Sequence, residues 1–411
     1  MGKNLSDKLK PTAAGDSKPP RPQLFDLSKS GSQDQLSQLL EENSHTKVID
    51  TYETQLEELF VLDNPWLNMD PPKKAKEFAA HKDEHFGSKE SHEVGNWVYL
   101  PWRHSLLHLL DDAGFQQVRT GRNRNLITKE EQQKYYHSTI SIAGLSVGNS
   151  CALSIVLTGG GKHLRLADPD TLELTNLNRI RGSIAELTEP KVYMSARQIY
   201  ELDPYADLTL YTDGVTPKNL KEFCNGADVI IDEIDNLAMK IHLRQQAQKN
   251  KTPLVMATDN GDSGVLDIER YDLDQNIVPF HGRAGDDIAE RVIGKKLPLP
   301  AVGQIIGGEI MGYDIAEERT VRSLLEIGKS IPTWPQLGSA ATFNGVLVAV
   351  AVRRILTGQP LITDRANASI PALIEPGFND KATTKKRLKT IKVLGDQFNQ
   401  AVEQMIQTPG V

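Results

Sequence analysis

The chain has 411 residues, of which 39% are hydrophobic and 25% charged, an ordinary composition for one large globular domain with an accessory region. Its formal net charge is −7, so no overall positive field favours nucleic acid as a partner. The two cysteines, Cys151 and Cys224, are too few for a disulfide framework or a four-cysteine zinc site, and they fit a reducing, cytoplasmic compartment.

The first 117 residues are expected to precede the main domain. Residues 1–35 are rich in Lys, Pro, Ser and Gly and have almost no large apolar side chains, which predicts a disordered tail. Residues 36–117 are expected to form a helical accessory region, because leucines such as Leu36, Leu39 and Leu56 recur at helical spacing.

Two pairs of histidines in this region have the spacing of metal ligands. His81, Glu84 and His85 fit the H-x-x-E-H pattern of some zinc proteases, but no downstream ligand helix follows, so we interpret them as a solvated helix face. His104 and His108 lie four residues apart among leucines, which favours packing on a core helix over metal ligation.

From residue 118 to residue 360, short apolar strands alternate with helices. This alternation predicts an α/β fold with a Rossmann-like, doubly wound, mostly parallel sheet. Residues 361–411 are expected to be a C-terminal extension. The longest apolar run, Gly345 to Val352, is too short to cross a bilayer, so no membrane contact is expected. The predicted strands are 139–143, 163–167, 227–234 and 253–257, and the predicted helices are 151–157 and 191–201.

The segment between the first predicted strand and helix has the features of a phosphate-binding loop. Gly144 and Gly148 bracket a turn whose backbone amides and helix dipole would point at an anion, although Ser146 stands where G-x-G-x-x-G has its second glycine. Asp168 and Asp170 end the next strand, where an acid usually holds a ribose hydroxyl. At this point NAD and ATP fit equally well.

A further set of residues favours ATP. Arg179 and Lys191 follow the two aspartates, and Asn176 precedes the arginine by three residues. A reaction at an α-phosphate calls for fixed cations, whereas a nicotinamide enzyme has no need of them here. Asp235 ends a later apolar strand, where a carboxylate can hold Mg²⁺.

In this order the motifs GLSVG, DPDTLELTNLNR, EPK and IDN resemble the ubiquitin-activating and ThiF/MoeB-type adenylyltransferase superfamily. The resemblance extends from about Arg119 to about Gly358 and includes the closing segment QLGSAATFNGVLVAVAVRRILTG. It implies ATP and Mg²⁺ as cofactors. It also implies roles for single residues: phosphate binding by the Gly144, Ser146 and Gly148 loop, nucleotide binding by Asp168, Asp170 and Asn236, transition-state contacts by Asn176, Arg179 and Lys191, and Mg²⁺ binding by Asp235.

The segment RTGRNRN is similar to the R-x-x-R motif of the family, whose second arginine reaches ATP across a homodimer. Arg119 and Arg122 match the motif, and Arg124 is a rival for the second position. The alternative is a basic solvated turn.

The chain also departs from the family pattern. The C-x-x-C pairs are absent, and no cysteine follows Cys224, so the thioester-forming cysteine of the crossover region is missing. Cys151 and Cys224 are expected to be packing residues. The sequence therefore predicts adenylation without an enzyme-bound thioester.

We thus expect a homodimeric, cytoplasmic enzyme that adenylates a carboxylate with ATP and releases pyrophosphate. The substrate could be a small protein, a peptide or a metabolite. Two alternatives stay open: an NAD(P)-dependent oxidoreductase, and a non-catalytic ATP-binding relative in which Ser146 marks lost chemistry.

Overall fold

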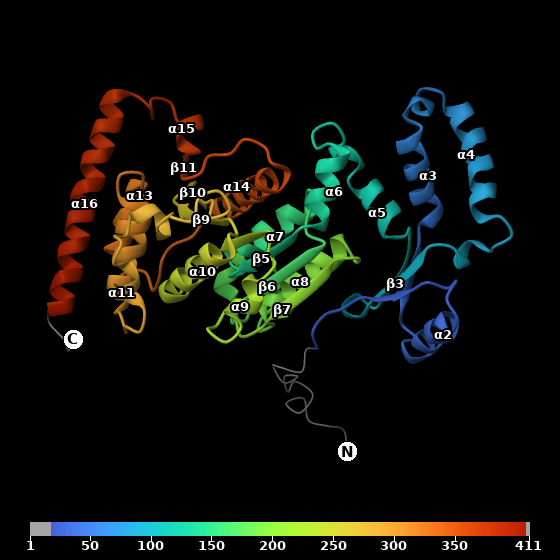
Figure 1. Cartoon of the computed structure of the whole chain (residues 1–411), viewed down its shortest axis with the longest axis horizontal. Helices are drawn as coiled ribbons and strands as arrows, with labels where there is room; N and C mark the ends of the chain where they lie inside the picture. The colour runs from blue at the N-terminus through green and yellow to red at the C-terminus, as the bar shows by residue number, and fades with distance from the viewer. Residues whose placement is uncertain (1–17, 408–411) are drawn as a thin grey trace, which may run out of the picture.

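Two units of mixed α/β structure follow each other along the chain (Figure 1). The computed structural model describes residues 18–407. The N-terminal unit is built on a four-stranded sheet of order β1-β3-β4-β2, and the larger unit on a seven-stranded sheet of order β11-β10-β9-β8-β5-β6-β7. Figure 1 shows the larger sheet in the middle of the molecule, with the N-terminal unit on one side and helix α16 on the other.

The N-terminal sheet is mixed, because β3 pairs antiparallel with β1 and β4, while β2 pairs parallel with β4. Helix α2 packs Leu36 and Leu39 against Phe25 and Trp97 of the sheet. The elements of this unit are β1 (Gln23–Phe25), α2 (Ser32–Glu42), β2 (Lys47–Asp50), α3 (Tyr52–Asp63), η1 (Pro65–Met69), α4 (Pro71–Phe86), η2 (Ser91–Glu93), β3 (Asn96–Leu100), η3 (Pro101–Arg103), β4 (Ser105–Leu109) and α5 (Asp112–Arg119).

This sheet is a difference from the sequence-based expectation of a helical accessory region. Of the predicted disordered tail, residues 1–17 lie outside the described residues, whereas residues 18–35 hold β1 and the start of α2. Phe25 is buried against Trp97, a residue more than 70 positions away in the sequence. No local pattern reveals such a contact, so the tail appeared unable to bury apolar surface.

The two histidine pairs occupy different environments. His81 and His85 lie on helix α4, as expected, and no group of three metal-ligating side chains occurs in the described part of the chain. His108 is fully buried, but it lies on strand β4, so the expected core helix is wrong. Its ring stacks between Trp97 and Tyr52, at centroid distances of 4.3 and 4.4 Å. The leucines beside it follow the alternation of a strand.

The larger sheet is parallel from β7 to β9 and ends in two antiparallel strands, which confirms the predicted Rossmann-like, mostly parallel fold. Strand β11 lies in the predicted C-terminal extension and adds an edge to the sheet by pairing with β10. The strands are β5 (Thr139–Ala143), β6 (His163–Ala167), β7 (Asp207–Tyr211), β8 (Val229–Asp232), β9 (Leu254–Asn260), β10 (Ser263–Glu269) and β11 (Arg365–Ala368).

Helices cover both faces of this sheet. Helices α7, α8 and α14 form the core of one face, while α9 and α10 form the core of the other. This two-sided cover is what buries strands that are apolar on both faces. The helices between the two units and around this sheet are η4 (Gly121–Asn123), α6 (Lys129–His137), α7 (Val147–Leu157), η5 (Leu174–Asn178), η6 (Ile184–Glu186), α8 (Lys191–Leu202), α9 (Leu220–Cys224), α10 (Leu237–Asn250) and α14 (Gly338–Thr357).

Helix α14 crosses α7 closely enough that a Cβ atom on Gly345 would lie 2.6 Å from the backbone of Ser150. Among the described residues, α14 alone has the length and hydropathy of a membrane span. The helix is longer than the apolar run from Gly345 to Val352 that the sequence analysis identified. Half of it is buried in the molecule, as is usual for a core helix.

The remaining segments pack over β9 and β10. Val265 of β10 belongs to one buried hydrophobic cluster with Met311, Val321 and Ile391, so the C-terminal helix α16 joins the core of the larger unit. These segments are η7 (Pro279–Gly282), α11 (Ile288–Val292), α12 (Leu299–Gly303), the π-helical η8 (Gln304–Gly312), α13 (Glu318–Leu324), α15 (Pro371–Ile374) and α16 (Lys381–Gln407).

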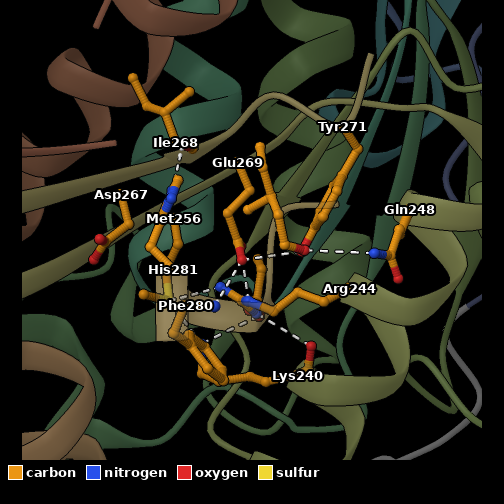
Figure 2. Close-up of polar contacts among 12 residues, drawn as sticks. Lys240, Arg244, Gln248, Met256, Asp267, Ile268, Glu269, Tyr271, Phe280 and His281 are labelled. Atoms are coloured by element: carbon orange, nitrogen blue, oxygen red, sulfur yellow. Dashed lines mark hydrogen bonds and ion pairs between the residues drawn. The ribbon is translucent and has the colours of Figure 1, made fainter. Parts of the chain in front are cut away.

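A buried charged cluster ties α10 to the sheet. The guanidinium of Arg244, on α10, is fully buried and lies 3.8 Å from the ring centre of Phe280 (Figure 2). Its Nη1 donates to Asp232 Oδ2 at 2.5 Å, and its Nε lies 2.8 Å from Glu269 Oε2. Lys240 Nζ lies 3.2 Å from the other oxygen of Asp232. Two cations thus face two acids in the interior.

The rest of the cluster completes the contacts of Glu269. The Tyr271 hydroxyl and the Phe280 backbone amide both donate to Glu269 Oε1, at 3.0 and 2.7 Å. The cluster thereby fixes Asp232 at the end of β8, three residues before Asp235. Asp232 therefore belongs to the buried cluster and also lies at the sheet edge that carries the candidate site.

Candidate active site

The predicted phosphate loop, called the phosphate loop below, begins at Gly144, which has φ +86°. A Cβ atom at this position would lie 2.3 Å from the carbonyl oxygen of Glu233, so only glycine fits. The Gly144 amide donates to Ala167 O at 2.8 Å. The loop is therefore held between the ends of β6 and β8.

Helix α7 starts directly after the loop, at Val147, four residues earlier than predicted. Ser146 is its N-cap residue, but the Ser146 side chain makes no capping hydrogen bond. Within the described residues, the backbone amides of Val147, Gly148 and Asn149 have no acceptor. Free amides at the positive end of a helix dipole are the donors that an anion site requires, and the sequence predicts phosphate binding here.

Asp168 and Lys191 are joined to the loop. Asp168 Oδ2 accepts from the Leu145 amide at 2.6 Å, and Oδ1 accepts from the Asp170 amide at 2.9 Å. Lys191 Nζ, which is buried, lies 2.8 Å from Asp170 Oδ2 and 3.9 Å from Asp168 Oδ1. Burial raises the pKa of Asp168, although the charge of Lys191 and the two amides act in the opposite direction.

Arg179 reaches the loop from the η5 turn. Its Nε donates to Ser146 Oγ at 3.0 Å, and its Nη1 donates to Asn178 Oδ1 at 3.0 Å and Thr175 O at 3.3 Å. The guanidinium forms no ion pair with an acid in the part of the chain that the structure describes. Asn176 shapes the turn, because its Oδ1 accepts from the Glu173 amide at 3.0 Å and its carbonyl accepts from the Arg179 amide.

Asp235 and Asn236 lie in the loop after β8. The backbone of this loop abuts Gly144, since a Cβ atom there would also lie 2.9 Å from the Ile234 nitrogen. The Asp235 carboxylate is exposed and has no partner within residues 18–407. Asn236 caps α10, with its Oδ1 accepting from the Met239 amide at 3.0 Å.

The R-x-x-R segment lies far from the phosphate loop of its own chain. Arg119 is held by Asp203 and Val156, and Arg124 donates to Leu62 O at 2.5 Å. Arg122 is exposed. Arg119 and Asn123, on either side of Arg122, donate to Val156 O and Thr158 O at the C-terminal end of the 11-residue helix α7, about 16 Å along its axis from the phosphate loop.

The structure thus brings six predicted residues together around one loop and leaves one apart. The six are Gly144, Ser146, Gly148, Asp168, Arg179 and Lys191, with Asp170 bonded to Lys191 beside them. The one apart is Arg122. The Asp235 loop contacts the phosphate loop through its backbone, while the side chains of Asn176 and Asn236 stabilise a turn and a helix start.

Residues 120–269 match the sequence model of the ThiF family. The chain contains a ThiF family domain. This match confirms the resemblance read from the loop and the D-x-D, N-x-x-R and D-N motifs.

Three curated proteins are similar to parts of this chain. The uncharacterized protein MT1398 of Mycobacterium tuberculosis is 37% identical over 285 residues, which is 69% of this chain and 39% of that protein. The sulfur carrier protein ThiS adenylyltransferase of Escherichia coli is 33% identical over 34% of this chain and 56% of its own length. The tRNA threonylcarbamoyladenosine dehydratase of Bacillus subtilis is 29% identical over 33% and 54%. The chain therefore spans roughly two fifths to just over half of the length of these relatives.

Two acids of the ThiF domain site were not found from the sequence. Asp259, at the end of β9, accepts from Asn344 Nδ2 at 2.6 Å and from Gln336 Nε2 at 3.3 Å. Burial raises the pKa of Asp259, against the lowering effects of these amides and of the Arg179 charge. Glu233 Oε1 accepts from the Ala257 amide at 2.9 Å, and burial raises its pKa well above the usual range. Glu233 follows strand β8 and Asp259 lies at the end of strand β9, at the sheet edge that carries Asp168; an acid at the end of an apolar strand is the signal that could have revealed them.

Both cysteines of the ThiF domain are buried, in agreement with the packing role predicted for them. Burial raises the pKa of Cys224 to about 12, and it raises the pKa of Cys151 well above its ordinary value. A thiol in this state is protonated at neutral pH and is a poor nucleophile.

Proposed function

We propose that the ThiF domain adenylates a carboxylate with ATP and releases pyrophosphate. The observation that carries this proposal is the placement of Arg179, a half-buried arginine without an acid partner in the described chain, against a loop whose helix amides are free. A cation that forms no ion pair and lies beside a predicted phosphate cradle supports chemistry on a phosphate, because it can stabilise charge that builds up in the transition state.

In the proposed reaction, a carboxylate oxygen of the substrate attacks the α-phosphorus of ATP. The bond from that phosphorus to the oxygen bridging the β-phosphate breaks, and pyrophosphate leaves with the electron pair. The guanidinium of Arg179 and the free amides of α7 would face the phosphates, and Lys191 would add a second cation. Asp168 keeps lone pairs for a ribose hydroxyl, because each of its oxygens accepts only one backbone amide.

Asp235 fits the role of the Mg²⁺ ligand. Its carboxylate is exposed at the sheet edge and is not neutralised by a cation of the described chain, and Mg²⁺ prefers carboxylate and phosphate oxygens. When bound, the ion would neutralise charge on the phosphate oxygens and orient them.

We further propose that no thioester forms on this chain. The support is the burial of both thiols together with their raised pKa values. Replacing both cysteines by serine is expected to leave pyrophosphate exchange within about twofold of wild type, since neither thiol touches the reacting atoms. The proposal is tested directly on the wild-type enzyme: with MgATP and an exchanging carboxylate, no thiol-labile covalent adduct of substrate and chain should form, and an adduct that disappears in the double serine variant would contradict it.

The proposed substrate is the carboxylate of a small protein, a peptide or a small acid. The name of one relative, a sulfur carrier protein adenylyltransferase, supports the first of these classes. The proposed enzyme is a cytoplasmic homodimer, in which Arg122 of one subunit completes the site of the other. The position of Arg122 at the far end of α7 supports a contribution from a second chain.

Mixing two inactive variants tests this arrangement. Arg122→Ala and Arg179→Ala should each lose activity, while mixed dimers should regain it, because one of their two sites has both arginines. The matched control is Arg124→Ala mixed with Arg179→Ala. Failure of every mixture to recover activity, with dimers present, would exclude a role of Arg122 in the partner's site.

The central test is ATP–pyrophosphate exchange with a panel of carboxylates, including glycine-terminated peptides and free amino acids. We expect exchange with at least one of them and its loss in Arg179→Ala and Asp235→Ala. Equal exchange in both variants would refute the site. Calorimetry with ATP and NAD separates the alternatives: NAD binding without ATP binding would indicate an oxidoreductase, and ATP binding without exchange would indicate a non-catalytic relative.

A further inference from the structure

Ser146 stands at a position where the family pattern has a glycine, and its hydroxyl links the phosphate loop to Arg179. A serine at a helix N-cap normally accepts a hydrogen bond from an amide of the first helical turn. Here no such bond forms, and the Ser146 Oγ accepts instead from Arg179 Nε at 3.0 Å. The hydroxyl is thus engaged by the arginine, while the amides of the first turn remain available.

The remaining contacts of Arg179 leave one nitrogen free. Nη1 is bonded to Asn178 and Thr175, both in the η5 turn. A hydrogen bond joins this turn to the segment before α14: Asn178 Nδ2 donates to Gln336 O at 2.7 Å. Nη2 has no partner within the described chain. The guanidinium is therefore held at two of its nitrogens and presents the third.

We propose that Ser146 is a positioning residue, which holds the guanidinium of Arg179 against the phosphate loop before nucleotide binds. This inference rests on the proposed ATP chemistry. A free arginine side chain loses much rotamer entropy when a ligand fixes it, so an arginine that is already oriented binds a phosphate oxygen at lower cost. The serine thus serves the site, and it does not mark lost chemistry.

The backbone at Ser146 tolerates this side chain. Its φ is −78°, outside the left-handed region that requires glycine. The residue is partly exposed, as is Arg179, so the bond between them lies at the mouth of the loop and not in the core. A change at Ser146 should therefore affect the position of the arginine more than the stability of the fold.

A double-mutant cycle on MgATP binding tests the proposal. We expect Ser146→Ala to weaken binding by about three- to tenfold, the loss of one hydrogen bond to a charged group. In the Arg179→Ala background, Ser146→Ala should change the affinity by less than about twofold, because a residue that acts through another has no separate effect. Ser146→Thr, which keeps a hydroxyl, should restore most of the affinity. Ser154→Ala, on the same helix, is the matched control.

The outcomes are distinguishable. If Ser146→Ala weakens binding equally with and without Arg179, the hydroxyl contacts the nucleotide itself and the positioning role is wrong. The role is also wrong if Ser146→Ala has no effect, or if the affinity falls only together with the melting temperature. If the wild-type chain binds no MgATP, the proposed function fails as well; if it binds MgATP and the cycle is additive, only the positioning role fails.

Discussion

Arg179 and Arg244 belong to the same ThiF domain, and the structure compensates their charges in opposite ways. Arg244 is fully buried and faces Glu269 and the ring of Phe280 (Figure 2), and it also pairs with Asp232. Arg179 is half-buried and is bonded only to a hydroxyl, an amide oxygen and a carbonyl oxygen. The charge of Arg244 is neutralised by acids inside the protein. The charge of Arg179 forms no ion pair in the described chain and lies beside the loop with free amides, where it can attract a phosphate.

The difference follows from the cost of removing a charge from water. A fully buried cation is tolerated only with partners, because an unpaired charge in the interior costs several kcal/mol. A cation at a partly hydrated site has no such need, and its attraction for an incoming phosphate is then not spent on an internal acid. We therefore expect Arg244 to determine stability and Arg179 to determine activity.

The largest expected effect is that of Arg244→Met on stability. The substitution leaves Glu269 buried without a cation and leaves Asp232 with Lys240 alone, so the free energy of unfolding should fall by about 3–5 kcal/mol. Urea denaturation followed by circular dichroism measures this. If the variant does not fold, Arg244→Lys, which retains a charge, should recover part of the loss. Wild-type stability in Arg244→Met would show that the cluster is not essential to the fold.

The second prediction is that Arg179 has the opposite profile to Arg244: its replacement should reduce activity and leave stability almost unchanged. Arg179→Ala should lower the rate of pyrophosphate exchange by about 10²–10³-fold, since a group that stabilises transition-state charge is lost. Its free energy of unfolding should stay within about 0.5 kcal/mol of wild type, as is usual for a residue without a buried partner. Exchange assays and urea denaturation on one preparation give both values. A large loss of stability would show that Arg179, like Arg244, is needed for the fold.

The third prediction concerns pH. Burial alone would raise the pKa of Asp232, but the charges of Lys240 and Arg244 outweigh it and hold the pKa below the ordinary 3.8. An acid with a lowered pKa stabilises the fold above its unfolded pKa and loses this contribution as the pH falls through the folded pKa. The gap in unfolding free energy between wild type and Asp232→Asn, roughly 3 kcal/mol at neutral pH, should therefore narrow below about pH 4. A gap that stays constant in a pH series of denaturation curves would contradict the pairing.

The smallest effect is expected at an exposed arginine. Arg322 lies 2.8 Å from Glu318 one helical turn away, and both side chains are largely exposed. Arg322→Ala should change the free energy of unfolding by less than about 0.5 kcal/mol and leave exchange unchanged. Thermal unfolding and the exchange assay check this. An effect as large as that of Arg244→Met would mean that burial does not distinguish the two arginines.

The sequence by itself determined the ThiF domain and which residues gather at the edge of its sheet. Strand β5 and strand β6 have the predicted bounds, and Gly144, Asp168, Arg179 and Lys191 meet as their order along the chain implies. The physical reason is that apolar strands and glycine turns are local signals, and that parallel strands bring their carboxyl ends to one edge. Residues placed after such strands must therefore lie close together.

Only the tertiary structure decided the contacts between distant segments. The N-terminal sheet depends on Phe25 meeting Trp97, and the buried cluster depends on Glu269 meeting Arg244. Likewise Ser146, which stands where the loop pattern has a glycine, is bonded to Arg179 from another turn. The periodicity of a sequence shows which faces are apolar, but the partner of a polar or aromatic side chain is set by the packing of whole elements, so these contacts had no local signature.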